Sequence, residues 1–260
     1  MESDRSAAFH GTYEGVTPRR SGLTTPGSDP SMMAKAAGYD ADGVTLDLED
    51  GVAEGEKERA RERVIEALRD LDWGGKAVSV RPNPIEHPAG LRDVVEVVER
   101  AGEALDTLVI PKVRRPGDVY TVGKLLDGLA AGSPEREVGV SVIIEEVEAL
   151  ARIDAVLGAH ERVEAVSLGF GDYAAAQDLK IDTIGGMAEG YPGDVWHHAR
   201  FRTVAAARGA GVAAYEGPYA DYSDSEGLRE ACRRSRALGF DGKGAIHPAQ
   251  LSVINEVFGE

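Results

Sequence analysis

Three carboxylates stand close together in the segment Gly43-Val44-Thr45-Leu46-Asp47-Leu48-Glu49-Asp50. The segment opens as an apolar, β-prone run, so we predict a buried strand that ends in these acids. Strand alternation places Asp47 and Glu49 on one face and Asp50 on the other. Acids at the end of a core strand are typical of α/β enzymes, which collect charge at the mouth of a sheet or barrel. The alternative interpretation is an acidic loop in which Asp50 caps the next helix.

Polar residues also follow the other predicted strands. In chain order these strand ends hold Arg81 with Pro82-Asn83-Pro84, Pro111-Lys112, Glu145-Glu146, Gly169-Phe170-Gly171-Asp172, Glu216-Gly217-Pro218 and His247-Pro248. The carboxyl ends of parallel strands share one rim of a barrel, so we expect these groups to converge on a single site.

Glu145 and Asp172 end neighbouring predicted strands, where two carboxylates could share a hard cation. Magnesium is commonly bound through one or two protein carboxylates together with water and substrate oxygens, so the pattern favours Mg²⁺. Zinc is disfavoured because no pair of histidines has ligand spacing at these strand ends. The alternative is that Glu145 forms a structural salt bridge with Arg81 or Lys112.

Arg81 emerges from the run Ala77-Val78-Ser79-Val80 and therefore lies near the predicted mouth. A guanidinium is planar and always charged, which suits it to bind a carboxylate or an enolate oxygen. Its alternative role is to neutralise the acidic rim.

Short β-rich runs alternate with amphipathic stretches of helical length along the chain. We predict strands at Gly22–Thr25, Gly43–Leu48, Ala77–Arg81, Thr107–Pro111, Gly139–Ile144, Ala165–Leu168, Val212–Tyr215 and Gly242–Ile246. We predict helices at Ser31–Gly38, Glu54–Leu71, Leu91–Ala101, Pro116–Leu129, Val147–Leu157, Asp194–Arg208, Ser225–Leu238 and Pro248–Val257.

Eight βα units in about 240 residues match the size of a (β/α)₈ TIM barrel, an α/β fold. An open doubly wound sheet is disfavoured because the chain contains neither a G-x-G-x-x-G nor a G-x-x-x-x-G-K-[ST] motif. We therefore expect a short N-terminal arm over residues 1–18 and a single barrel domain over residues 19–260.

The composition of the 260-residue chain excludes several classes of partner. Its net charge of −16 argues against nucleic-acid backbones and anionic membranes, and we expect a surface adapted to high salt, as in halophilic proteins. The chain has neither a long apolar run nor an apolar signal-peptide core, so we expect a cytoplasmic protein. The single cysteine, Cys232, lies in a helical pattern and is expected to be a core residue.

Taken in order, these residues resemble the HpcH/HpaI aldolase and citrate lyase β-subunit family. They are most similar to its CitE-like group, which includes malyl-CoA, β-methylmalyl-CoA and citramalyl-CoA lyases. The motifs that carry the resemblance are Arg20-Ser21, Pro26-Gly27-Ser28, Leu46–Val52, Glu56-Lys57, Ala60-Arg61, Val80–Asn83, Ile110–Val113, Ile144-Glu145, Gly169–Asp172 and Gly239–Gln250.

The resemblance implies a homotrimeric or homohexameric (β/α)₈ enzyme with Mg²⁺ held by Glu145 and Asp172. It implies that Arg81 binds the substrate and faces its oxygens. It also implies that Asp47, Glu49 and Asp50 form the acidic mouth of the second strand and hydrogen-bond to Arg81 or to metal-bound water. Arg20 and Lys35 are expected to contact the phosphates of coenzyme A.

The implied reaction is a retro-Claisen cleavage of a short 3-hydroxyacyl-CoA, with an acyl-CoA and a small 2-keto acid, glyoxylate or pyruvate, as products. It needs no covalent intermediate, so neither Cys232 nor a Schiff-base lysine is required, and Lys112 is expected to be structural. Two alternatives remain: a metal-dependent 2-keto-acid aldolase acting on free acids, and a non-catalytic CoA-binding subunit like citrate lyase β. Relatives often continue beyond the position of Glu260, which favours the last.

Overall fold

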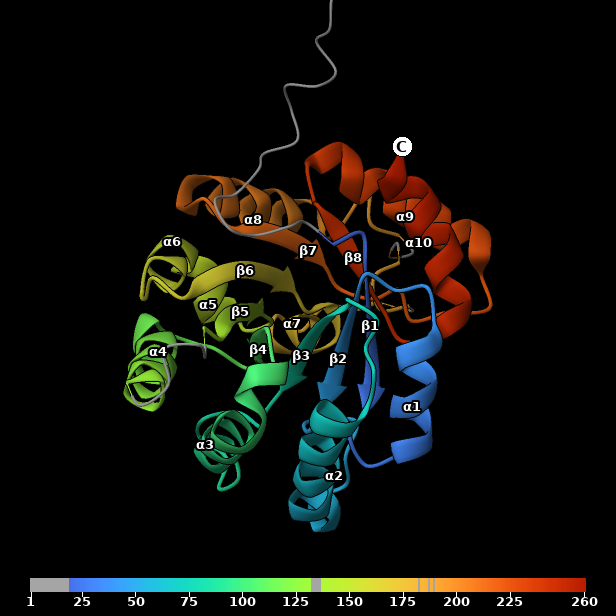
Figure 1. Ribbon diagram of the computed structural model, residues 1–260. Coiled ribbons are helices and arrows are strands. Elements are labelled where there is room, and N and C mark those ends of the chain that lie inside the picture. The colour runs from blue at the N-terminus through green and yellow to red at the C-terminus, as the bar shows by residue number, and fades with distance from the viewer. Residues whose placement is uncertain (1–18, 132–136, 182, 187, 189) are drawn as a thin grey trace, which may run out of the picture.

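The computed structural model describes residues 19–131, 137–181, 183–186, 188 and 190–260. The predicted arm over residues 1–18 lies outside this range. Eight parallel strands close into a barrel in chain order, because β1 pairs with both β2 and β8. The (β/α)₈ fold predicted from the sequence is confirmed, and helices surround the barrel (Figure 1).

The strands lie close to their predicted positions. They are β1 (Ser21–Pro26), β2 (Gly43–Asp47), β3 (Ala77–Arg81), β4 (Thr107–Ile110), β5 (Gly139–Ile144), β6 (Val163–Leu168), β7 (Ala213–Glu216) and β8 (Gly242–Ala245). The register aligns Asp47 of β2 with Arg81 of β3, and Ile144 of β5 with Leu168 of β6. The polar residues that follow these strands are therefore brought to the same rim.

The helices are α1 (Pro30–Gly38), α2 (Lys57–Asp70), α3 (Gly90–Ala101), α4 (Pro116–Ala130), α5 (Val147–Ala151), α6 (Ile153–Leu157), α7 (Phe170–Ala176), α8 (His197–Ala210), α9 (Ser225–Leu238) and α10 (Leu251–Gly259). Short 3₁₀ turns occur at Glu54–Glu56, Gly102–Ala104 and Pro248–Gln250.

Local sequence explains where several helices begin and end. Asp29 caps α1 by accepting hydrogen bonds from the amides of Ser31 and Met32, as expected for an N-cap aspartate. At the other end of a helix, Gly239 ends α9 in the left-handed conformation that glycine adopts readily. Helix α8 runs two residues beyond Arg208, its predicted last residue, and is capped by Gly211 in the same left-handed conformation.

One predicted helix was wrong in detail, and one helix was missed. The predicted helix Val147–Leu157 is divided into α5 and α6 at Arg152, whose backbone leaves helical geometry. Helix α7 was not predicted, because it has seven residues and two of its first residues, with its cap, belong to the glycine-rich run Gly169-Phe170-Gly171.

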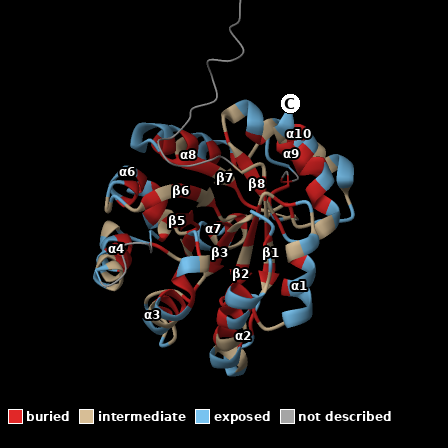
Figure 2. Cartoon of the chain, in the orientation of Figure 1, coloured by how far each residue is buried: buried red, intermediate tan, exposed pale blue. Residues whose placement is uncertain are grey.

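The main core lies between the barrel and the surrounding helices. Helix α2 turns Val64, Ile65 and Leu68 inward, at the spacing of one helical face. Figure 2 shows this pattern around the molecule: the strands and inner helix faces are buried, and the outer faces are exposed. No helix in the described part of the chain is long and apolar enough to span a membrane.

A buried ion pair fixes the loop that follows β3. Arg61 of α2 donates to Asp93 of α3 at 2.8 Å, and both side chains are almost fully buried. The second oxygen of Asp93 accepts hydrogen bonds from the backbone amide and the side-chain amide of Asn83. This network ties two helices to the loop two residues beyond Arg81.

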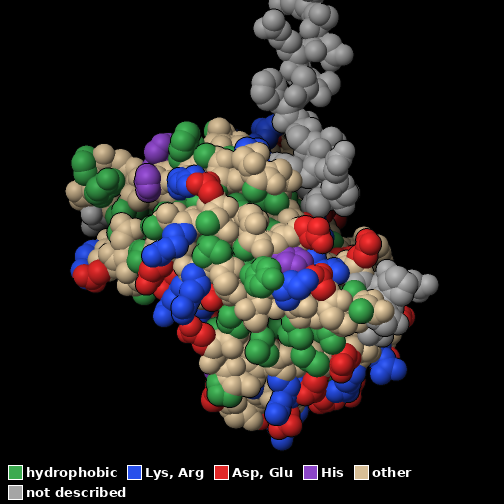
Figure 3. Space-filling view, turned by 90° about the vertical axis from the view of Figure 1, so that its left-hand side faces the viewer, with side chains coloured by type: hydrophobic (Ala, Val, Ile, Leu, Met, Phe, Trp, Pro, Cys, Tyr) green, Lys and Arg blue, Asp and Glu red, His purple; other side chains and the backbone are tan. Residues whose placement is uncertain are grey.

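The surface carries acids and bases side by side. On the face shown in Figure 3, Lys and Arg side chains lie close to Asp and Glu side chains. Several ion pairs on the described surface are bidentate, among them those between Arg100 and Glu62 and between Arg229 and Glu256. Acids nevertheless outnumber bases by 45 to 29 over the whole chain.

Candidate active site

Arg81 and Asp47 form the centre of the rim. Two parallel hydrogen bonds of 2.7 Å join the guanidinium to the carboxylate, which is the strongest geometry for this pair. Glu49 approaches the same guanidinium at 3.1 Å. The prediction that Asp47 and Glu49 share one face is confirmed by this common partner. Burial acts to lower the pKa of Arg81, but Asp47 and Glu49 outweigh it, so the pKa is raised.

Asp47 is saturated with donors. Besides Arg81 it accepts hydrogen bonds from the backbone amides of Glu49 and Gly51. Burial acts to raise its pKa, but Arg81 and these amides outweigh that effect and hold the pKa below its usual value. A side chain at Gly51 would place its Cβ 2.5 Å from the Asp47 carboxylate, so glycine is needed there. Asp47 is therefore an ionised anchor for Arg81.

Lys112 lies among the acids. Its ammonium donates to Glu49 and lies 3.3 Å from Asp50 and 3.4 Å from Asp172. Its backbone amide donates to Glu145 at 2.6 Å. Burial acts to lower the pKa of Lys112, but Glu49 and the other acids outweigh it, so the pKa is raised and the ammonium is retained. The sequence placed Lys112 on the rim and predicted a structural role for it, without its contacts to Glu49, Asp50 and Asp172.

Glu145 has no ion-pair partner among the described residues; the structure gives its carboxylate only the Lys112 amide. The salt bridge considered from the sequence is absent, since the Lys112 ammonium turns to Glu49 instead. Burial raises the pKa of Glu145 to about 8, against the Lys112 hydrogen bond and with help from the charges of Glu49 and Asp172. A buried carboxylate of this kind favours a cation beside it.

Asp172 comes from the first turn of α7, directly after β6, and its side chain is 41% exposed. Five carboxylates, those of Asp47, Glu49, Asp50, Glu145 and Asp172, thus meet two cations, Arg81 and Lys112. The excess negative charge suits a divalent cation. The described residues contain no group of three or more His, Cys, Asp or Glu side chains placed as a metal cage. A site with few protein ligands fits Mg²⁺, which keeps several of its waters, better than it fits zinc.

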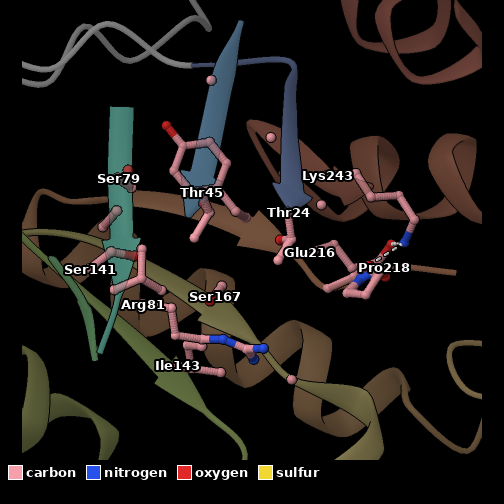
Figure 4. A pocket seen from close by; sticks show the side chains of 18 of the residues that line it. Thr24, Thr45, Ser79, Arg81, Ser141, Ile143, Ser167, Glu216, Pro218 and Lys243 are labelled. Atoms are coloured by element: carbon pink, nitrogen blue, oxygen red, sulfur yellow. Dashed lines mark hydrogen bonds and ion pairs between the residues drawn. The ribbon is translucent and has the colours of Figure 1, made fainter. Parts of the chain in front are cut away.

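A cavity of about 220 Å³ opens beside these groups and runs down the barrel axis. Small residues line much of it, among them Thr24, Thr45, Ser79, Ser141 and Ser167, and the side chain of Arg81 extends into it (Figure 4). Barrels of this fold are usually filled by bulky branched side chains. The space can therefore admit a small polar substrate.

A second charged cluster lies behind the rim. Glu216 is fully buried and pairs with Arg200 of α8. It also pairs with Lys243 of β8 (Figure 4). The guanidinium of Arg200 lies 4.9 Å from the ring centre of Phe170, two residues before Asp172. Glu216 is the last residue of β7 and lines the same cavity as Arg81, as expected of a strand-end group, but its charge is neutralised inside the protein. The partners were missed because nothing in local sequence pattern pairs residues on three different elements.

Other predicted residues lie away from the acid cluster. Arg20 precedes β1, at the opposite end of the barrel from Arg81, and its guanidinium is bound by Asp42 at 2.7 Å. Lys35 is in the last turn of α1, on its exposed side. Glu146, directly after Glu145, pairs with Arg114 at 3.2 Å. The structure therefore unites Asp47, Glu49, Asp50, Arg81, Glu145 and Asp172, but brings neither Arg20 nor Lys35 to them.

The sequence matches a known protein family and known enzymes. A family model described as HpcH/HpaI aldolase/citrate lyase matches residues 20–248. An L-malyl-CoA/beta-methylmalyl-CoA lyase of Cereibacter sphaeroides is 43% identical over 251 residues, which span 93% of this chain and 79% of that protein.

Solved structures have the same architecture. The citrate lyase beta subunit of Mycobacterium tuberculosis, complexed with oxaloacetate and magnesium, aligns with a TM-score of 0.76 and 28% identity over 95% of this chain and 98% of its own. Protein CitE of the same organism, in complex with magnesium, acetoacetate and coenzyme A, gives a TM-score of 0.74 and 29% identity over 92% and 80% of the two chains.

Proposed function

The chain belongs to the HpcH/HpaI aldolase/citrate lyase family, and on that basis we propose that it is a Mg²⁺-dependent carbon–carbon lyase. Its substrate is a short 3-hydroxyacyl-CoA such as malyl-, β-methylmalyl- or citramalyl-CoA, and its products are an acyl-CoA and glyoxylate or pyruvate. The observation that carries the proposal is the buried carboxylate of Glu145, which has no ion-pair partner among the described residues and lines the cavity beside Arg81.

Glu145 and Asp172 would hold the metal, with water and substrate completing its shell. Bound there, Mg²⁺ supplies Lewis-acid chemistry that lowers the pKa of the substrate hydroxyl. A base would take the hydroxyl proton, and the C–C bond would break to give the keto acid and the enolate of the acyl-CoA, which then takes up a proton. The fixed charge of Arg81 would stabilise that enolate. Asp47 keeps Arg81 oriented through its two hydrogen bonds.

Glu49 and Asp50 complete the proposed catalytic set. Glu49 is buried between the cations of Arg81 and Lys112. Burial raises the pKa of Glu49, and Arg81 and Lys112 only partly offset that effect. Asp50 is exposed at the entrance and contacts Lys112. We propose that both orient the water and the substrate oxygens around the metal.

Arg20 and Lys35 are kept as proposed phosphate contacts for coenzyme A. A phosphate that used Arg20 would have to compete with Asp42, which holds the guanidinium with two hydrogen bonds. Neutralising Asp42 by Asp42→Asn should therefore tighten CoA binding if Arg20 is a contact and leave it unchanged otherwise.

The function is tested by offering the three CoA thioesters at high salt with Mg²⁺ and trapping the released glyoxylate or pyruvate. Release that EDTA abolishes would establish the lyase, and the preferred thioester would identify the substrate. Absence of release from all three would refute the proposal.

A non-catalytic subunit is the second candidate, since the fold aligns with a citrate lyase beta subunit over 98% of that chain. It predicts CoA binding without turnover. The free-acid aldolase predicts turnover of 2-keto acids without CoA binding. Measuring CoA affinity by calorimetry beside the assay separates these three functions.

We further propose a cytoplasmic, salt-adapted homotrimer or homohexamer in which residues 1–18 form an arm and residues 19–260 the barrel domain. The acid excess of the sequence supports salt adaptation. Light scattering after size exclusion gives the oligomer, and activity across a salt series tests the adaptation; a maximum in dilute buffer would contradict it.

A further inference from the structure

Lys112 has an unusual backbone. Its φ of +50° lies in the left-handed region, and Asp178 is the only other non-glycine residue with positive φ in the described part of the chain. This conformation is unfavourable for a residue with a Cβ atom. Such strain in a folded protein points to a function at that position.

The strained backbone directs the amide of Lys112 toward the proposed metal site. Its amide donates to Oε1 of Glu145 at 2.6 Å and so fixes the orientation of that buried carboxylate. Glycine would adopt the same backbone without strain. The lysine side chain must therefore contribute something that glycine could not.

The side chain reaches the second proposed ligand. Its ammonium lies 3.4 Å from Oδ2 of Asp172 and also contacts Glu49 and Asp50. One residue thus holds both carboxylates, Glu145 by its backbone and Asp172 by its charge. The two ligands come from different strand ends, and Lys112 bridges them.

We propose that Lys112 is a resident counter-ion that holds the acid cluster together in the metal-free protein and yields Asp172 to Mg²⁺ when the metal binds. This inference rests on the metal site proposed above. The ammonium and the divalent ion attract the same carboxylate and repel each other, so Lys112 opposes metal binding while keeping the ligands in place. It is a positioning residue that sets the affinity of the site for Mg²⁺.

The test is a calorimetric titration of the full-length protein with Mg²⁺, repeated by electron paramagnetic resonance with Mn²⁺. The variants are Lys112→Met, which keeps length and loses charge, Lys112→Arg, which keeps charge, and Lys112→Gly, which also relieves the backbone. Lys124→Met is the matched control, because it removes a lysine that pairs with an acid, Asp127, on the surface of α4.

We expect Lys112→Met and Lys112→Gly to bind Mg²⁺ about tenfold more tightly than wild type, since a cation near the ion has been removed. Lys112→Arg and Lys124→Met should stay within about twofold. Lys112→Gly keeps the test valid if Lys112→Met does not fold. Wild-type affinity or weaker binding in both uncharged variants would overturn the inference. If the wild type binds no metal, the proposed metal site fails, and this inference fails with it.

Discussion

The Asp47 carboxylate and the Arg81 guanidinium are joined by two parallel hydrogen bonds, each 2.7 Å long, across neighbouring strands of the barrel. Because Asp47 is ionised and saturated with donors, it orients Arg81 and is not placed to exchange protons. Under the proposed mechanism, Arg81 would contact the substrate and Asp47 would act through Arg81.

Asp47→Asn should lower kcat for cleavage of the CoA thioester by about 10–100-fold, the usual cost of removing an orienting partner. The asparagine keeps the shape but offers one acceptor oxygen to a guanidinium that now uses two. Steady-state kinetics measures the effect.

Asp42→Asn is the matched control, because it breaks a similar two-bond pair with Arg20 at the other end of the barrel. It should leave kcat unchanged. Equal losses of kcat in the two variants would show that both pairs act only through stability and would contradict the role given to Asp47.

Loss of either proposed ligand should weaken metal binding. We expect Glu145→Gln and Asp172→Asn each to lower Mg²⁺ affinity at least about tenfold in calorimetry and to abolish EDTA-sensitive turnover. Glu146→Gln is the control, since that neighbouring acid pairs with Arg114 outside the cluster. Turnover that survives both ligand substitutions would refute the metal assignment.

The sequence predicted the barrel and most of the rim because both follow local rules. Strands of alternating pattern ending in polar residues give the fold, and parallel strands bring their ends together. Asp47, Glu49 and Arg81 were predicted to meet for this reason, and they do.

The features of the site that the sequence did not predict depend on contacts between elements far apart in the chain. Arg200, Glu216 and Lys243 lie on α8, β7 and β8, and only the closed barrel shows that Glu216 pairs with both cations. Lys112 follows its strand as predicted, but its left-handed backbone, and hence its link to Glu145, cannot be read from residue type. Helix α7 was missed because its glycine-rich start lacks helical propensity.

Glu164 should make stability depend on pH. Burial raises its pKa, and the Thr107 hydroxyl and Arg19 only partly offset that effect. The folded state then holds this proton more tightly than the unfolded state, so its contribution to stability is full below the unfolded pKa and is lost as pH rises through the folded pKa.

Glu164→Gln should therefore be more stable than wild type at pH 8 and no more stable at pH 4, as measured by urea unfolding. Glu161→Gln, at an exposed position nearby, should show no such difference between the two pH values. A stability gain for Glu164→Gln that was the same at both pH values would contradict the titration argument.

Cys232 should resist modification. It is fully buried in α9, and burial raises the pKa of its thiol to about 11. Thiolate is the reactive form, so little is present at pH 8. Native protein treated with iodoacetamide should stay unlabelled by mass spectrometry, and urea-unfolded protein should gain one adduct. Rapid labelling of the native protein would contradict its placement in the core.

The buried cluster behind the rim should be the most sensitive charged group for stability. Glu216→Gln would leave the cations of Arg200 and Lys243 without their shared carboxylate in a fully buried position. Removing one partner of a buried ion pair costs about 3–5 kcal/mol, because the remaining charge cannot be hydrated. Urea unfolding should show a loss of that size.

Glu256→Gln breaks a two-bond pair with Arg229 that faces solvent and is the matched control. Its loss of stability should be far smaller, since water can solvate the freed guanidinium.

Arg200 also contacts Phe170 at the start of α7, the helix that carries Asp172. If Glu216→Gln loses stability as expected, its Mg²⁺ affinity should fall as well, whereas Glu256→Gln should bind the metal like wild type. Equal stability losses in the two variants would show that burial does not strengthen the cluster.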